Sequence, residues 1–201
     1  MSRLARVTRK TNETRIELQL ELDGAGRHQI GTGMPFYDHM LQQVARHGAF
    51  DLTIEAEGDL EVDAHHTVED VALCLGQAFA EALGDKRGIV RYGSARIPLD
   101  EALAEVTVDF GGRPYLVFRA DLLQKRREER IGVFPVELVE HVFQSFSVTA
   151  RANVHVNLLY GDNLHHCVEA IFKAFARACR QAVAVDLRSP GVPSTKGTLD
   201  A

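Results

Sequence analysis

Two copies of a His-His-x-x-Glu motif are the part of this chain best suited to chemistry. They are His65-His66-x-x-Glu69 and His165-His166-x-x-Glu169. Residues four apart share one face of a helix, so His65 and Glu69 project together, whereas His66 points about 100° around the helix. Each motif therefore offers a His and a Glu to one metal ion and its other His to a second ion.

A histidine earlier in each half of the chain extends this donor set. His39 follows Asp38 and His141 follows Glu140, and each precedes its histidine pair by 26 and 24 residues respectively. The resulting six histidines and two glutamates divide into two sites of three His and one Glu. Imidazole and carboxylate donors suit Mn, Fe or Zn. A single such pattern is more often a surface or capping pair on a helix, but its repetition favours the metal interpretation.

The elements that carry these residues also occur twice in the same order. The first set is a strand at 13–22, a turn region at 24–33, a helix at 35–47, a strand at 50–56 and a helix from 65 to 84. The second set is a strand at 101–109 that continues as a paired strand at 115–118, a helix at 137–146, a strand at 153–159 and a helix at 165–179. Alternating apolar residues predict half-buried strands, and apolar residues three or four apart predict helices.

This repetition predicts an α/β fold of the α+β type built by internal duplication. We expect two homologous halves at roughly 8–90 and 91–187, each a β-sheet layer packed on helices. No Pro/Ser-rich linker separates the halves, so residues 1–201 should form a single unit. We interpret 188–201 as an irregular C-terminal tail and the charged run at 125–130 as a solvated loop.

Composition narrows the function classes. The 201 residues are 45% apolar with a net charge of −5, which argues against nucleic-acid binding through a general basic field. No apolar run approaches the roughly 20 residues that span a membrane, and the first ten residues lack the apolar core of a secretory signal. Cysteines 74, 167 and 179 lie in apolar stretches and indicate buried, reduced thiols of a cytoplasmic protein. We expect neither a nucleic-acid nor a membrane partner.

Three further histidines, His28, His47 and His155, have no counterpart in the other half. We interpret each as structural or surface-exposed, with His28 in a turn and His155 in a strand.

Several long polar segments of the chain resemble one known family. They are residues 11–14, 35–40, 63–70, 91–93, 98–102, 112–115, 140–145, 165–178 and 193–197. These segments are similar to the imidazoleglycerol-phosphate dehydratase family of histidine biosynthesis, and the resemblance covers nearly the whole chain. Two departures are Thr195, where the family commonly has Ser, and the loop at 125–130, which is longer than usual.

The resemblance implies two manganese ions per active site, and a homo-oligomer of twenty-four subunits with sites at subunit interfaces. The metal ligands it implies are His39, His65, His66, Glu69, His141, His165, His166 and Glu169, the same set that the repeat gives. It further places Glu13 at the substrate. The residues that it implies around the substrate phosphate are Arg91, Arg113, Lys173, Ser194, Thr195 and Lys196.

The implied reaction converts D-erythro-imidazole-glycerol phosphate to imidazole-acetol phosphate and water. The departing proton is not next to a carbonyl, so the imidazole ring is the available electron sink. Two ions bound to the ring nitrogens would act as Lewis acids and as a template. We expect Glu13 to transfer protons, although the alternative of a strand-edge carboxylate stays open at this point.

Two other functions remain as alternatives. A dinuclear metal phosphohydrolase would usually bridge its ions with carboxylates, whereas this donor set is rich in imidazole. A non-catalytic metal-storage protein would need neither the arginines nor the Ser194-Thr195-Lys196 segment.

Overall fold

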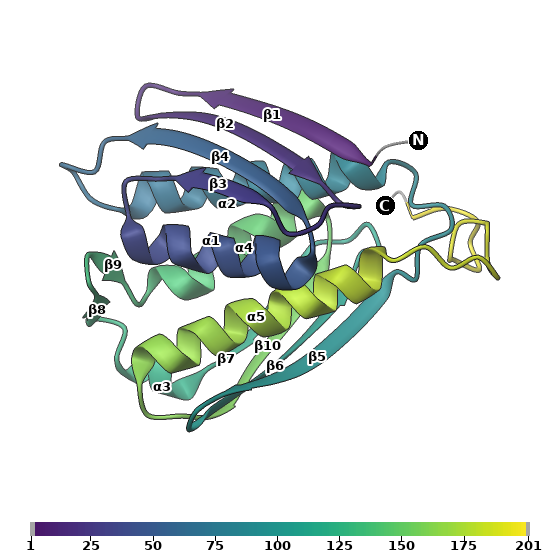
Figure 1. Ribbon diagram of the computed structural model, residues 1–201. Helices are drawn as coiled ribbons and strands as arrows, with labels where there is room; N and C mark the ends of the chain where they lie inside the picture. The colour runs from purple at the N-terminus through teal and green to yellow at the C-terminus, as the bar shows by residue number, and fades with distance from the viewer. Residues whose placement is uncertain (1–2, 200–201) are drawn as a thin grey trace.

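The first half of the chain folds as a four-stranded sheet that carries two helices on one face. A computed structural model describes residues 3–199 (Figure 1). Its first elements are β1 (Leu4–Lys10), β2 (Thr14–Glu21), β3 (His28–Gly31), α1 (Pro35–Gly48), β4 (Asp51–Gly58) and α2 (His65–Leu83). The strand order is β1-β2-β4-β3, with β3 parallel to β4 and the other neighbours antiparallel.

The second half repeats this arrangement with one insertion. Its elements are β5 (Tyr92–Leu99), β6 (Ala102–Asp109), β7 (Tyr115–Arg119), α3 (Asp121–Lys125), β8 (Arg130–Ile131), β9 (Phe134–Pro135), α4 (Leu138–Ala150), β10 (Asn153–Tyr160) and α5 (Leu164–Val183). The strand order β5-β6-β10-β7 matches the first sheet strand for strand, and β7 is likewise parallel to β10. These two similar sheet-and-helix halves confirm the predicted fold class.

Alternation along the strands explains why each sheet buries a single face. In β2, Ile16, Leu18 and Leu20 are almost completely buried while the residues between them face outward. Ala104 and Val106 of β6 follow the same pattern. Because side chains alternate with a period of two, these apolar residues turn toward the helices, which lie between the two sheets in Figure 1.

The helix layer crosses between the halves. Helix α1 packs on α5, and α2 packs on α4, so each pair joins one helix from each half. Aromatic contacts bridge both pairs, with Phe36 5.2 Å from the His165 ring and Phe79 5.3 Å from Phe146 between ring centroids. The helices that carry the two His-His-x-x-Glu motifs, α2 and α5, are therefore packed against α4 and α1 of the other half.

Several elements differ from the sequence prediction. β7 does not pair with β6 as expected but runs parallel to β10, and His28 lies in β3 rather than in a turn. Strands β1, β3, β5, β8 and β9 and helix α3 were not predicted at all. β3 has only four residues, none of them buried, so it carries no alternating signal. The charged run at 125–130 does form a solvated connection, which runs from the last residue of α3 to the first residue of β8.

The three cysteines are free thiols in the core, which confirms their predicted state. Burial raises the pKa of Cys74 and of Cys167 to about 11, so both stay protonated and unreactive. Within residues 3–199, the structure contains no helix that is both long and apolar enough to cross a membrane.

Gly76 allows α2 to approach α4 closely, and this gives a test of the helix crossing. A Cβ at this position would lie 2.2 Å from Thr149 Oγ1 and 2.5 Å from the Phe146 carbonyl oxygen. Gly→Ala inside a helix ordinarily stabilises by up to about 1 kcal/mol. Here we expect Gly76→Ala to lower the free energy of unfolding by about 1–2 kcal/mol, because overpacking outweighs the helix propensity.

Denaturant unfolding of Gly76→Ala beside the exposed neighbour Gln77→Ala measures this effect. The control should change stability by less than about 0.5 kcal/mol. A Gly76→Ala variant more stable than the native chain would contradict the close crossing of α2 and α4.

Candidate metal centre

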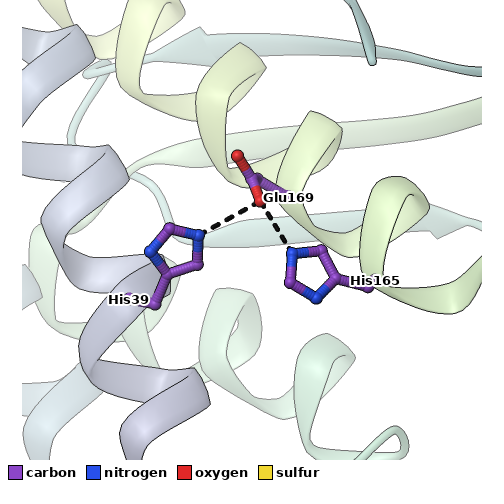
Figure 2. Close-up of side chains that lie close together, drawn as sticks. All are labelled: His39, His165 and Glu169. Atoms are coloured by element: carbon purple, nitrogen blue, oxygen red, sulfur yellow. Dashed lines mark hydrogen bonds and ion pairs between the residues drawn. The ribbon is translucent and has the colours of Figure 1, made fainter. Parts of the chain in front are cut away.

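The first donor group joins α1 to the N-terminal part of α5. Figure 2 shows His39 and His165 pointing at one carboxylate oxygen, Glu169 Oε2. The His39 Nε2 atom lies 3.2 Å from this oxygen and the His165 Nε2 atom 3.0 Å from it. Ligand atoms of these three residues all lie within 4.8 Å of one another, a spacing that could hold a metal ion.

The Glu169 carboxylate is kept ionised in a nearly buried position. The residue is only 8% exposed, and Lys173 Nζ lies 2.6 Å from its Oε1 atom. Burial would raise the pKa of this carboxyl, but hydrogen bonds from Lys173, His39 and His165 lower it to about 2. The group therefore presents an anionic oxygen to a cation at neutral pH.

The second donor group consists of His65 and Glu69 of α2 and His141 of α4. Their ligand atoms also lie within 4.8 Å of one another, and the His65 and His141 rings are 4.5 Å apart between centroids. His141 Nε2 is 3.4 Å from Glu69 Oε1 but outside hydrogen-bond geometry. Among residues 3–199 it is one of three buried side-chain polar atoms without a hydrogen-bond partner. A buried imidazole nitrogen left unpaired beside a carboxylate fits a metal ligand.

Local capping places the histidine pairs in the first turns of their helices. The Asn163 side chain accepts hydrogen bonds from the backbone N–H of His165 (2.9 Å) and of His166 (3.3 Å). Asp63 Oδ1 accepts from the His65 N–H at 2.7 Å. These contacts satisfy N–H groups that a helix start leaves unpaired, and they fix where each motif begins.

His66 and His166 belong to neither donor group. Instead, the Nδ1 atom of each faces a carboxylate that the sequence alone did not suggest. Asp59 lies 3.0 Å from His66 Nδ1, and Glu101 lies 2.7 Å from His166 Nδ1. The hydrogen bond from His166 lowers the pKa of Glu101 to about 2.

Glu13 lies in the turn between β1 and β2, beside the first motif. Its side chain is 54% exposed, and its Oε2 atom is 3.8 Å from His66 Nδ1. Thr11 Oγ1 accepts hydrogen bonds from the backbone N–H groups of Glu13 and Thr14, which shapes the turn. The predicted substrate carboxylate is thus close to one of the predicted ligands.

Most of the residues predicted around the phosphate meet in a different place. Arg91, Arg113, Ser194, Thr195 and Lys196 line a surface pocket of about 590 Å³. Arg91 is held there by Asp109, with Nε–Oδ1 at 2.7 Å, and by the Pro193 carbonyl at 2.9 Å. A basic pocket with hydroxyl donors is suited to a phosphate monoester.

Lys173 is separated from this pocket, since it pairs with Glu169. The backbone N–H of Arg91 donates to the Ala182 carbonyl. Ala182 lies on α5, 17 residues after His165. At 1.5 Å per residue, the pocket and the first donor group of one chain are about 25 Å apart.

Sequence reasoning missed the carboxylates that support the site. Besides Asp59 and Glu101, it overlooked Asp109 and also Gln43, which lies 3.4 Å from His39 Nδ1 and 3.1 Å from His47 Nε2. Glu101 stands within the segment 98–102 that supports the resemblance, so that motif could have drawn attention to it. Gln43 is four residues from both His39 and His47 on α1, so helical spacing could also have found it. Asp59 and Asp109 reach their partners only through the folded loops and strands, which no local pattern predicts.

Comparisons with known proteins identify the family that this chain resembles. The family model for imidazoleglycerol-phosphate dehydratase matches residues 32–179. The imidazoleglycerol-phosphate dehydratase of Trichlorobacter lovleyi is 55% identical over 99% of this chain and 100% of its own length. The corresponding protein of Geobacter metallireducens is 57% identical with the same coverage.

Solved structures of this family share the fold. The crystal structure of the Staphylococcus aureus imidazoleglycerol-phosphate dehydratase superposes with a TM-score of 0.80 at 40% identity, covering 90% of this chain and 99% of that one. The Pyrococcus furiosus enzyme, solved in complex with (S)-C348, gives 0.81 at 33% identity, covering 96% and 99%. The chain therefore belongs to the imidazoleglycerol-phosphate dehydratase family of hydro-lyases, which dehydrate imidazole-glycerol phosphate in histidine biosynthesis.

Proposed function

We propose that this chain is a manganese-dependent dehydratase that acts on D-erythro-imidazole-glycerol phosphate in the cytoplasm. The observation that carries the metal dependence is the pair of three-donor groups, each with two imidazoles and one carboxylate. Together with His66 and His166, these groups supply the eight ligands. When bound, two such ions would stabilise negative charge on the substrate's imidazole ring as Lewis acids.

We further propose that the active site is complete only in a homo-oligomer, of twenty-four subunits by family resemblance. Two observations support sharing between subunits. Each donor group holds three ligands in one chain, with His66 and His166 turned to other partners. The phosphate pocket lies about 25 Å from the first donor group along α5, too far for a substrate with three carbons between ring and phosphate. A neighbouring subunit would supply the missing parts.

Glu13 is the proposed proton-transfer group. Its carboxylate is exposed and free to reach a substrate, and its position 3.8 Å from His66 Nδ1 places it beside the proposed metal site. Carboxylates are common general acids and bases, and a proton must be removed from a carbon that no carbonyl activates.

Arg91, Arg113, Ser194, Thr195 and Lys196 are the proposed phosphate ligands. Arg91 is preset for this task, since Asp109 and the Pro193 carbonyl hold its guanidinium in place. Lys173 is also proposed as a phosphate ligand. Because it lies beside Glu169, it would contact a phosphate held in the pocket of a neighbouring subunit.

Metal removal tests the central proposal. Dialysis of the native chain against a chelator should abolish formation of imidazole-acetol phosphate, and Mn²⁺ should restore it. His39→Ala removes one donor and should lower the bound Mn²⁺, whereas His155→Ala on β10 should not.

Metal-free protein that keeps full dehydratase activity would refute the proposal. Phosphate release in place of the acetol product would favour a phosphohydrolase, and metal uptake without either product would favour storage.

Replacing Glu13 tests the proton-transfer role. Glu13→Gln should lower kcat by about 100-fold or more while Mn²⁺ content is unchanged, because a glutamine amide cannot act as a general acid or base at neutral pH. Glu17→Gln, on the exposed face of β2, serves as the matched control. Normal turnover by Glu13→Gln would show that its carboxylate is merely a strand-edge charge.

Replacing Lys196 tests the phosphate pocket. Loss of a charge-assisted contact of about 1.5–3 kcal/mol should raise KM by roughly 10- to 100-fold in Lys196→Ala while Mn²⁺ content stays the same. Steady-state kinetics beside Lys125→Ala, a lysine on α3, provides the comparison. Unchanged KM would remove Lys196 from the substrate site.

A further inference from the structure

The two halves place a glutamate at the same position of their first hairpin. Glu13 immediately precedes β2, and Glu101 immediately precedes β6, which occupies the matching place in the second sheet. His66 and His166 are likewise matched as the second histidine of each motif. If the duplication had been kept unchanged, Glu13 would contact His66 as Glu101 contacts His166.

In the second half, Glu101 ties the hairpin to the start of α5. Its Oε2 atom accepts a hydrogen bond from His166 Nδ1 at 2.7 Å. Its Oε1 atom accepts from the backbone N–H of Asn163 at 2.7 Å and of Asp162 at 3.2 Å. The carboxylate is thus fully engaged in holding the helix start and the imidazole.

In the first half, Asp59 has taken this contact. Both of its oxygens lie within hydrogen-bond distance of His66 Nδ1, at 3.0 and 3.1 Å, while Glu13 Oε2 stands back at 3.8 Å. The Asp59 N–H also donates to the Glu13 carbonyl at 3.1 Å, which fixes the two residues side by side. The Asp59 side chain is 20% exposed and that of Glu13 54%.

We propose that Asp59 and Glu101 are matched positioning residues for His66 and His166, and that Asp59 releases Glu13 to act on substrate. A carboxylate can only accept, so each imidazole donates from Nδ1 and keeps its Nε2 lone pair for a metal ion. This inference rests on the proposed metal-dependent function. Its new content is the division of work between Asp59 and Glu13 in the first half. In the second half Glu101 makes the Nδ1 contact itself, and the other nearby acid, Asp100, lies 3.8 Å from His166 Nε2.

Mn²⁺ binding by the full-length metal-free chain tests the positioning role. Free Mn²⁺ is followed by electron paramagnetic resonance during titration of Asp59→Ala and Glu101→Gln, with the exposed Glu61→Gln on the same loop as Asp59 as control. Glu101→Gln keeps an oxygen for the two backbone N–H groups, and thermal unfolding checks that each variant folds. We expect Mn²⁺ affinity to fall about 10- to 100-fold in both variants but not in the control.

A second arm tests the release of Glu13. In Asp59→Ala, the Glu13 carboxylate can move onto His66, so saturating Mn²⁺ should leave kcat low, whereas in Glu101→Gln it should restore kcat. Glu13→Gln alone should bind Mn²⁺ normally. Adding Glu13→Gln to Asp59→Ala should weaken binding beyond the loss in Asp59→Ala, because the substitute acceptor is gone.

The outcomes separate the two proposals. Mn²⁺ affinities of Asp59→Ala and Glu101→Gln equal to that of Glu61→Gln would overturn the positioning roles. A double variant that binds Mn²⁺ no more weakly than Asp59→Ala would overturn the release of Glu13. Native chain that binds Mn²⁺ but forms no acetol product would instead contradict the proposed function, and the variants' affinities would still decide the positioning roles.

Discussion

The crossing of the helix layer is the constraint on which the site depends. Each donor group takes two candidate ligands from a motif in one half and its third from a helix of the other half, either α1 or α4. Neither group exists unless α1 lies on α5 and α2 on α4. Close packing enforces this arrangement, because the backbone of α4 occupies the space that a Cβ atom at position 76 of α2 would need. The packing of the helices therefore also sets the geometry of the donor groups.

Duplication supplies the scaffold, and single residues then make the halves different. Four residues after Glu169 stands Lys173, whereas the matching place after Glu69 is Leu73. The Glu169 carboxylate is nearly buried and has three partners, while the Glu69 side chain is 38% exposed. Burying an anion without a partner costs free energy. The Lys173 ammonium therefore stabilises the buried Glu169 carboxylate even when no metal ion is bound. The more exposed Glu69 does not need such a cation.

Local periodicity was enough to predict the helices that carry the ligands and most of the central strands. It also predicted that His65 and Glu69 would share a face, because that depends on one helix alone. It did not predict β3, which is short, or the pairing of β7 with β10, because β7 is only partly buried. Nor did it separate Lys173 from Arg91, because that separation depends on the Arg91 backbone bonding near the far end of α5. Long-range packing decides these features, and no window of sequence records it.

The separation between the proposed phosphate pocket and the donor groups has a structural reason within the fold. The histidine pairs stand in the first turns of α2 and α5, whereas Arg91 follows the far end of α2 and bonds near the far end of α5. Both ends of the helix layer thus carry side chains that are proposed for the site, with the hydrophobic core between them. A helix of 20 residues cannot bring its ends together, so no rearrangement within one folded chain would join the two parts. This separation is the physical reason for proposing that copies of the chain share one site.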